Sequence, residues 1–235
     1  MRRAGIIELD IDGRGPKRGF VFDPHRLALP CWAEVSARPS LLLTLDRHFD
    51  TVPPVHPPAR GLSVDELELH AREKCDHRNY DHVLAAMSGG IISEAIIVAR
   101  AKPVGAVISR TDLICAPTLD LITAEWGTDH ATPESKRAHE AVERASSIIL
   151  DVDLDCFTTP SDADPTTVVP WSLELIRDFV MPRGSEAFWN SVLGKCVGFT
   201  FAREPSHCGG LVASGRLFEK ACQVLFVELF RSDLP

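Results

Sequence analysis

Two short clusters of acidic residues directly follow apolar stretches of the chain. The first cluster reads Asp-Arg-His-Phe-Asp at 46–50, after Leu-Leu-Leu-Thr-Leu. The second reads Asp-Val-Asp-Leu-Asp at 151–155, after Ser-Ser-Ile-Ile-Leu. Side chains alternate between the two faces of an extended strand, so every second residue of each cluster points to the same side. Carboxylates and one imidazole are thus expected to converge where two strands end.

Several carboxylates at the mouth of an apolar core repel one another and resist ionisation. Protonation is one remedy and a bound cation is another, and the imidazole beside them favours a metal. Aspartate oxygens with imidazole nitrogen suit Mn²⁺, and less exclusively Zn²⁺, Fe²⁺ or Mg²⁺. Two clusters offer enough carboxylates for two ions, which in such sites lie about 3.5–4 Å apart and activate a water. The candidate ligands in these clusters are Asp46, His48, Asp50, Asp151, Asp153 and Asp155.

Other interpretations of the second cluster are open. Its alternating aspartates match the start of a calcium-binding loop, but Cys156 stands where that loop needs glycine and Asp162 where it needs glutamate. An apolar strand followed by Asp-x-Asp is also typical of magnesium-dependent phosphatases, with Asp151 as the nucleophile. Leu154 departs from that pattern, which has Thr or Val there. A purely structural role for the acids is a further alternative.

The elements that must position these residues alternate between strands and helices. Apolar runs predict strands, nearly continuous and therefore buried on both faces, at 19–23, 40–46, 105–110, 146–155, 196–202 and 224–230. Start signals predict helices from Ser63 to Lys74, after Thr132 and after Ser214, and a further helix is expected at 171–180. The segment 51–62 holds four prolines and is expected to be a loop. Such alternation indicates an α/β fold, whose ligands gather at the carboxyl ends of the strands.

Composition limits the remaining classes. The chain has 235 residues, 45% hydrophobic and 25% charged, which fits a single domain over 1–235. A net charge of −8 disfavours nucleic acid as a partner. Without a run of 18 apolar residues, we expect no membrane span. The seven cysteines form no C-x-x-C pair, which favours reduced, mostly buried thiols and a cytoplasmic location.

These motifs together resemble the arginase, or ureohydrolase, superfamily. Asp46, His48 and Asp50 match its Asp-x-His-x-Asp motif, and Asp153 with Asp155 match its later Asp-x-Asp motif, although Asp151 with Asp153 is an alternative register. The resemblance assigns one upstream histidine as a further ligand, here His25. It also assigns a glutamate of the closing strand to the substrate guanidinium, here Glu228 in VLFVELF.

The segments DPHRLALPCW, LLTLDRHFD and LDVDLDCF are similar to a branch of the superfamily that includes peptide arginases. The resemblance implies a three-layer α/β/α fold with a mostly parallel sheet, in the manner of arginases and deacetylases. It implies two Mn²⁺ ions as cofactors. The implied activity is hydrolysis of an arginine guanidinium within a ribosomally made peptide, giving ornithine and urea. The sequence CFTTP at 156–160 departs from the ending typical of ordinary arginases, which favours the peptide over free arginine.

Further residues are candidates for catalysis. His77 or the nearby His82 could shuttle a proton, as a loop histidine does in arginases. Glu204 and His207 follow the predicted strand at 196–202 and are expected on the substrate side or in a proton relay. The alternatives to a peptide arginase are a small-molecule ureohydrolase or amidinohydrolase, the magnesium-dependent phosphatase, and a non-catalytic binding protein with an inherited fold. An oligomer is compatible with all of them.

Overall fold

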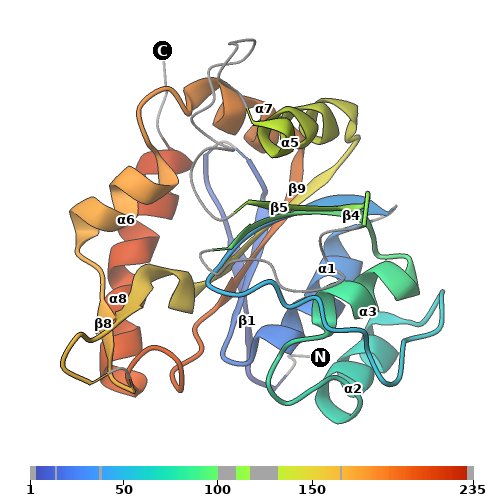
Figure 1. The fold of residues 1–235 in the computed structure, drawn as a ribbon. Coiled ribbons are helices and arrows are strands. Elements are labelled where there is room, and N and C mark those ends of the chain that lie inside the picture. The colour runs from blue at the N-terminus through green and yellow to red at the C-terminus, as the bar shows by residue number, and fades with distance from the viewer. Residues whose placement is uncertain are drawn as a thin grey trace.

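A seven-stranded sheet forms the centre of the computed structural model, which describes residues 4–13, 15–36, 39–99, 110–116, 132–164 and 166–231. In spatial order its strands are β1 (Ile6–Asp10), β2 (Arg18–Phe22), β9 (Cys196–Ala202), β6 (Ile148–Asp153), β3 (Ser40–Asp46), β4 (Ile92–Ala99) and β5 (Leu113–Ala116). β1 pairs antiparallel with β2, and every other pairing is parallel (Figure 1). The carboxyl ends of β2, β9, β6 and β3 therefore meet at one edge.

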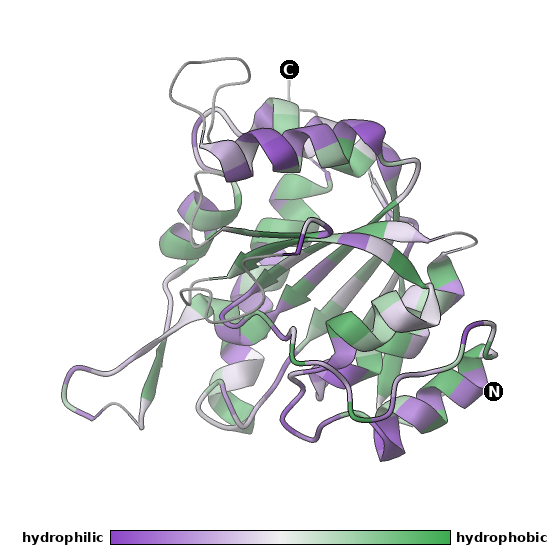
Figure 2. Cartoon of the chain, turned by 45° about the vertical axis from the view of Figure 1, so that its right-hand side comes forward, coloured by the Kyte–Doolittle hydropathy of each residue, from purple (hydrophilic) through white to green (hydrophobic). Residues whose placement is uncertain are grey.

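Helices cover both faces of the sheet. One face packs against α1 (Ala28–Val35), α2 (Val64–Glu73) and α3 (His82–Gly89). The other packs against α5 (Pro133–Arg144), α6 (Leu173–Val180), α7 (Glu186–Lys195), α8 (Leu211–Cys222) and the π-helical η4 (Gln223–Leu229). Figure 2 shows hydrophobic residues along the strands and hydrophilic ones on the outer helix faces. This is a three-layer α/β/α architecture.

Alternation along the strands explains why their sequences are continuously apolar. In β3, Leu41, Leu43 and Leu45 belong to the core on the α5–α8 side, whereas Leu42 belongs to the core on the α1–α3 side. A strand buried on both faces must be apolar at every position until it reaches the sheet edge. In β3 and β6 the charged residues accordingly begin only near the carboxyl end of the strand, at Asp46 and Asp151.

The predicted helix starts are confirmed at three places. Ser63 forms a capping box with Glu66 at the start of α2, and Thr132 accepts from the Ser135 amide at the start of α5. Ser172 caps α6, within the predicted segment 171–180. The expected cap at Ser214 is wrong, because α8 begins at Leu211. Ser214 lies inside that helix and donates its hydroxyl to the Arg203 carbonyl oxygen at 3.1 Å.

Two strand predictions need correction. The run 224–230 is not a strand: it lies in η4 and the residue after it, and continues α8 without a break. Its buried residues are Val224, Leu225, Leu229 and Phe230, a five-residue spacing that suits one face of this wide helix rather than strand alternation. The run 146–155 forms β6 only to Asp153, after which the 3-10 turn η3 (Leu154–Phe157) carries Asp155. The strand expected at 105–110 falls, except for Arg110, outside the described residues.

Two further features bear on the sequence expectations. Within the described ranges, the structure contains no helix whose length and apolarity would let it cross a membrane. None of the seven cysteines forms a disulfide, and Cys31, Cys75, Cys156, Cys196 and Cys208 are buried.

Candidate metal centre

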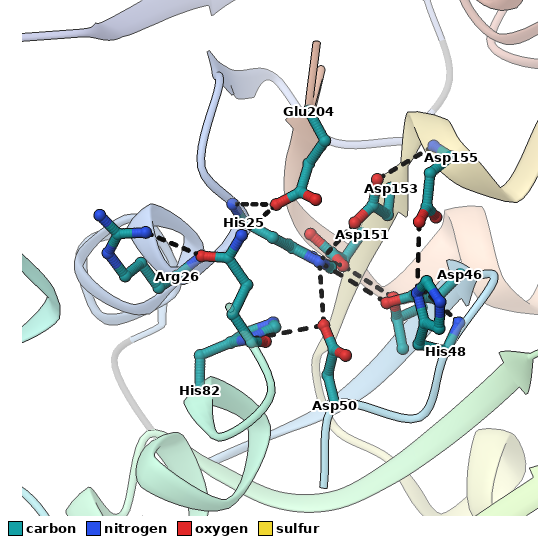
Figure 3. A network of polar contacts seen from close by, with 12 residues as sticks. His25, Arg26, Asp46, His48, Asp50, His82, Asp151, Asp153, Asp155 and Glu204 are labelled. Carbon is teal, nitrogen blue, oxygen red and sulfur yellow. Dashed lines mark hydrogen bonds and ion pairs between the residues drawn. The ribbon is translucent and has the colours of Figure 1, made fainter. Parts of the chain in front are cut away.

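The predicted metal ligands and Glu204 lie together at the carboxyl edge of the sheet (Figure 3). His25 opens the 3-10 turn η1 (His25–Leu27) after β2, and Asp46 ends β3. Asp153 ends β6, and Glu204 follows β9 by two residues. Because these four strands are parallel neighbours, their ends bring residues far apart in sequence into one cluster.

An inner group surrounds the imidazole of His25. Its Nδ1 lies 3.0 Å from Asp153 Oδ2, 3.5 Å from Asp50 Oδ2 and 3.6 Å from Asp46 Oδ2. This nitrogen is buried and makes no hydrogen bond, although three carboxylates face it. On the opposite side of the ring, Nε2 lies 2.8 Å from Asp151 Oδ2. With the ring proton on Nε2, the Nδ1 lone pair faces the three carboxylates.

An outer group surrounds His48. Its Nδ1 lies 3.2 Å from Asp155 Oδ2 and 3.9 Å from Asp46 Oδ1. Asp46 thus faces His25 with one oxygen and His48 with the other. The His48 side chain is 39% exposed, whereas that of His25 is 1% exposed. The outer group therefore lies at the mouth of the cluster, and the inner group lies in its buried part.

Electrostatics show why the cluster suits divalent cations. Burial raises the pKa of Asp46 well above its ordinary value, and the neighbouring charges of Asp50, Asp153 and Asp155 raise it further. Burial likewise raises the pKa of Asp153, with Asp155 and Glu204 adding to the effect. A cation between such groups offsets their repulsion and the loss of water.

The donor atoms themselves fit such cations. Among the ligands predicted from the sequence, three buried atoms are without hydrogen-bond partners: His25 Nδ1, Asp50 Oδ1 and Asp155 Oδ1. The residues form two adjoining metal-capable groups, His25–Asp46–Asp153 and Asp46–His48–Asp155, which share Asp46. Asp50 Oδ2 is a further carboxylate oxygen beside the first group. Carboxylate oxygens with one imidazole nitrogen in each group form a donor set that Mn²⁺ accepts readily.

Asp151 differs from the other acids of its strand. Its Oδ2 accepts from Thr44 Oγ1 at 2.7 Å and faces His25 Nε2, while its Oδ1 accepts from Thr200 Oγ1 at 2.5 Å. Burial alone would raise its pKa, but the positive charge and hydrogen bond of His25, with the two threonines, lower it. A carboxylate behind a ligating histidine fixes the ring and its tautomer.

This placement bears on two sequence alternatives. Asp151 belongs to no metal-capable group formed by the described residues, so the geometry favours Asp153 with Asp155 as the Asp-x-Asp pair. Both of its oxygens are engaged by neighbouring side chains, and the residue is fully buried. A phosphate has no path to such a carboxylate, which argues against Asp151 as a phosphatase nucleophile.

The histidines expected to shuttle protons occupy different environments. His77 is exposed in the loop before α3 and joins no metal-capable group of the described chain. His82 is fully buried, with its ring 4.2 Å from that of His25, and burial lowers its pKa to about 3. His82 is therefore neutral at ordinary pH, and it forms a metal-capable group with His25 and Asp50. His207 is 45% exposed, and its Nε2 lies 3.6 Å from Glu204 Oε2.

Glu204 closes the cluster from the β9 side. Its Oε1 accepts from the His25 amide at 3.0 Å and from the Asn79 side chain. It forms a further metal-capable group with Asp155 and His207. Burial raises its pKa, and the positive charge of His25 opposes that rise. The expectation of a role on the substrate side is consistent with this position.

Glu228 lies elsewhere. On η4 it accepts from Arg177 Nε at 2.6 Å and Arg177 Nη2 at 2.8 Å, a bidentate pair that joins η4 to α6. The sequence placed it at the end of a closing strand, and that strand does not exist. The last parallel strand of the described chain is β9, and the first acidic residue after it is Glu204.

Sequence reasoning missed three residues that support the centre. Thr44 and Thr200 lie in the middle of apolar runs, where a hydroxyl that hydrogen-bonds Asp151 looks like an ordinary strand residue. Asn79 lies in the polar loop DHRNYD, where asparagine is common. Its only distinguishing property is its tolerance of left-handed backbone, which no pattern in a single sequence reveals.

Comparison with known proteins gave structural matches only. No protein-family model matches the chain, and no curated protein matches it. Solved structures similar to it include two arginases. Arginase from Bacillus caldovelox shows 14% identity and a TM-score of 0.47, over 92% of this chain and 69% of that one. Arginase from Bacillus cereus shows 15% identity and a TM-score of 0.47, over 92% and 71%.

Proposed function

We propose that this chain is a dimanganese hydrolase that cleaves the guanidinium of an arginine residue within a peptide, giving ornithine and urea. The observation that carries the proposal is the position of Asp46 between two histidines. One of its oxygens faces His25 Nδ1 and the other faces His48 Nδ1, and each histidine has a further aspartate of its own. These residues would hold a pair of cations, one beside each histidine, with Asp46 common to both groups.

The chain's residues divide the work of holding the metals. His25, Asp46, Asp50 and Asp153 would hold the inner cation, and His48, Asp46 and Asp155 the outer one. Asp151 keeps the Nδ1 lone pair of His25 directed at the inner position. When bound, such a pair of cations supplies Lewis-acid activation of water and stabilises developing charge.

Glu204 is the carboxylate best placed to bind the guanidinium. Its Oε1 is occupied by two amide donors, and its Oε2 is the oxygen that faces His207. The residue is 6% exposed. A guanidinium held by a buried carboxylate gains charge-assisted hydrogen bonds that are stronger than those at the surface. Glu204 thus takes the role that the sequence resemblance gave to Glu228.

His207 is the candidate proton donor. It is partly exposed at the mouth, beside the carboxylate proposed to hold the substrate. A protonated imidazole there can transfer its proton to the leaving amine and recover another from solvent. His82 cannot act in this way, because its ring is fully buried and its pKa is lowered to about 3.

The surroundings of Asp155 support a peptide substrate. The chain continues from η3 directly into a hairpin of β7 (Thr158–Pro160) and β8 (Val168–Pro170), which projects from the body in Figures 1 and 2. Val169 on this hairpin is 50% exposed. A projecting hairpin beside the mouth offers backbone and apolar surface to the residues that flank an arginine, which free arginine lacks.

The test is reconstitution of the purified chain with Mn²⁺, followed by metal counting and two assays. We expect two ions per chain for the wild type and loss of both in Asp46→Asn, because both groups share that carboxylate. Asp162→Asn, in an exposed loop, is the matched control and should retain both ions. An arginine-containing peptide should lose one carbon, two nitrogen and two hydrogen atoms by mass spectrometry, and release urea.

Two outcomes would contradict the proposal in different ways. Rapid urea release from free arginine beside an unmodified peptide would indicate a small-molecule ureohydrolase. A chain that retains no metal after gel filtration, and gains no heat stability from Mn²⁺, would overturn the metal centre itself.

A further inference from the structure

Asn79 is a buried residue in an unusual backbone conformation beside the metal centre. Its φ angle is 63°, in the left-handed region that few non-glycine residues adopt. Within the described ranges, the other non-glycine residues with positive φ are Asp50 at 47° and Glu204 at 36°. Asp50 and Glu204 contact His25, and Asn79 contacts the next residue, Arg26. Backbone of this kind concentrates where the surrounding contacts dictate the conformation.

The contacts of Asn79 join three separate segments. Its Oδ1 accepts from the Arg26 amide at 3.3 Å and from Arg26 Nη1 at 3.0 Å, which holds the turn that carries His25. Its Nδ2 donates to Glu204 Oε1, in the loop after β9. Its backbone carbonyl faces His82 Nδ1 at 2.8 Å, at the start of α3. The side-chain oxygen, the side-chain nitrogen and the backbone carbonyl of Asn79 therefore each contact a different segment.

These contacts decide which oxygen of Glu204 is free. Oε1 receives the Asn79 side chain and the His25 amide, so neither donor competes for Oε2. Oε2 lies 3.6 Å from His207 Nε2, on the exposed side of the cluster. Without Asn79, one donor remains on Oε1 and the carboxylate can rotate.

We propose that Asn79 is a positioning residue: it orients Glu204 toward the substrate and fixes the turn that presents His25 to the inner metal position. The substrate half of this inference depends on the function proposed above. The metal half does not, because it concerns only the presentation of His25.

The chemistry of the position explains why asparagine occupies it. Glycine adopts the left-handed backbone but offers no side chain to Arg26 or Glu204. Aspartate also tolerates this backbone and could accept from Arg26, but it has no N–H for Glu204 and would place a second carboxylate against it. Asparagine combines the backbone tolerance with one acceptor and one donor.

The experiment uses the full chain and the variants Asn79→Gly, Glu204→Gln and the double variant. Mn²⁺ affinity is measured by calorimetry, and KM and kcat on an arginine-containing peptide. Asn79→Gly should weaken Mn²⁺ binding by about 10–100-fold, as loss of a supporting contact behind a ligand does. Glu204→Gln keeps an acceptor at Oε1 and should bind Mn²⁺ almost as the wild type does.

The substrate effect is tested by non-additivity. Each single variant should raise KM by about tenfold or more, the size expected when a hydrogen bond to a charged group is lost. If Asn79 acts on the substrate through Glu204, the double variant should show no further rise in KM beyond Glu204→Gln. If Asn79→Gly instead loosened the structure in general, the KM increase in the double variant would be the product of the increases in the two single variants. Arg78→Ala, the exposed neighbour, is the control and should change neither quantity.

Three results would overturn the inference or separate it from the proposed function. Wild-type Mn²⁺ affinity and KM in Asn79→Gly would overturn it, and so would multiplying KM effects. If Asn79→Gly does not fold, two variants test the halves separately. Asn79→Asp keeps the backbone and the Arg26 contacts, so it should raise KM while leaving Mn²⁺ affinity near that of the wild type, and an unchanged KM would overturn the substrate half. Arg26→Ala removes the contact of Arg26 Nη1 with Asn79, so it should weaken Mn²⁺ binding, and an unchanged affinity would overturn the metal half. If no guanidinium substrate is turned over while Asn79→Gly still weakens Mn²⁺ binding, the proposed function fails and the positioning of His25 stands.

Discussion

Three aspartates spaced by two residues have three different environments. Asp151 is hydrogen-bonded by Thr44 and Thr200 and lies behind His25. Asp153 faces the other side of the His25 ring, and its Oδ1 accepts from the Asp155 amide at 3.0 Å. Asp155 has left the strand and faces His48. Each carboxylate therefore has a separate effect on metal binding.

Asp151→Asn should weaken metal binding without removing a site. The variant loses the negative charge that faces His25 Nε2, so the charge-assisted hydrogen bond that fixes the imidazole tautomer becomes a weaker neutral one. We expect Mn²⁺ affinity to fall by about 10–100-fold, with two ions still bound at saturation. Asp153→Asn should instead lose at least one ion. Metal counting and calorimetry on both variants measure the difference, and the reverse result would establish the register of Asp151 with Asp153.

The sequence was enough to predict that these aspartates lie in one cluster. It was not enough to predict which of them face a metal position and which one supports a ligand. Alternate spacing places residues on one face only while the chain stays extended, and the chain leaves β6 after Asp153. A pattern of residue types does not show where a strand gives way to a 3-10 turn. The contacts of Asp151 depend on hydroxyls of two other strands, and those of Asn79 depend on a backbone conformation, so neither could be predicted.

At the scale of elements, a glycine lets α1 approach β9 closely. A Cβ on Gly198 would lie 2.4 Å from Val35 Cγ2 and 2.7 Å from Val35 Cβ. α1 follows His25 along the chain, and β9 leads into Glu204. This contact therefore sets the distance between two elements that carry site residues.

Gly198→Ala should destabilise the fold by about 1–3 kcal/mol, the usual cost of overpacking a core. Val35→Ala in the same chain should recover part of the loss by making room. Gly215→Ala is the matched control: it lies on the exposed side of α8, where a Cβ would meet nothing within 4 Å. It should stabilise the helix by about 0.5–1 kcal/mol. Urea denaturation measures all three, and a neutral Gly198→Ala would show that α1 and β9 are free to separate.

Glu228→Gln tests the corrected assignment of the C-terminal segment. The variant loses the ion pair with Arg177, which joins η4 to α6 away from the metal centre. Partly exposed ion pairs contribute little to stability. We expect Mn²⁺ affinity, kcat and KM to stay within about twofold of the wild type, while Glu204→Gln raises KM. A rise in KM for Glu228→Gln alone would return the guanidinium contact to that residue.

The errors at this scale have a common cause. Strands such as β3 and β9, and helices with strong caps such as α2 and α5, follow from local sequence alone. The run 224–230 is as apolar as a buried strand, but it continues a helix whose last turn is at Cys222. Apolar content predicts burial, whereas the choice between strand and helix for a short run depends on what precedes it and on the surface it covers.

At the scale of the whole molecule, the sheet concentrates negative charge at one edge of two apolar cores. Burial and mutual repulsion raise the pKa values of Asp46 and Asp153 well above their ordinary values. For each such group, the folded state binds more protons than the unfolded state at any pH between the unfolded and folded pKa values. Stability therefore falls as pH rises from the unfolded value of about 4 through the raised folded value, and stays reduced above it. Without metal, the centre costs stability that the rest of the fold must supply.

Asp46→Asn isolates this effect, because asparagine keeps an acceptor for the His48 amide, which donates to Asp46 Oδ1 at 2.7 Å. In metal-free protein near neutral pH, we expect the variant to be more stable than the wild type, since one of the crowded carboxylates is gone. The difference should shrink as pH falls toward about 4, where Asp46 is protonated in both states of the wild type. Saturating Mn²⁺ should reverse the order, because only the wild type retains the carboxylate that both metal groups share, and binding to the folded state stabilises it. Urea denaturation at several pH values measures the free energy of unfolding of both proteins, once with chelator and once with Mn²⁺, which gives four curves of stability against pH. A metal-free variant that is less stable than the wild type at neutral pH would mean that Asp46 supports the fold by itself, and that the cluster is a structural network rather than a centre that needs cations.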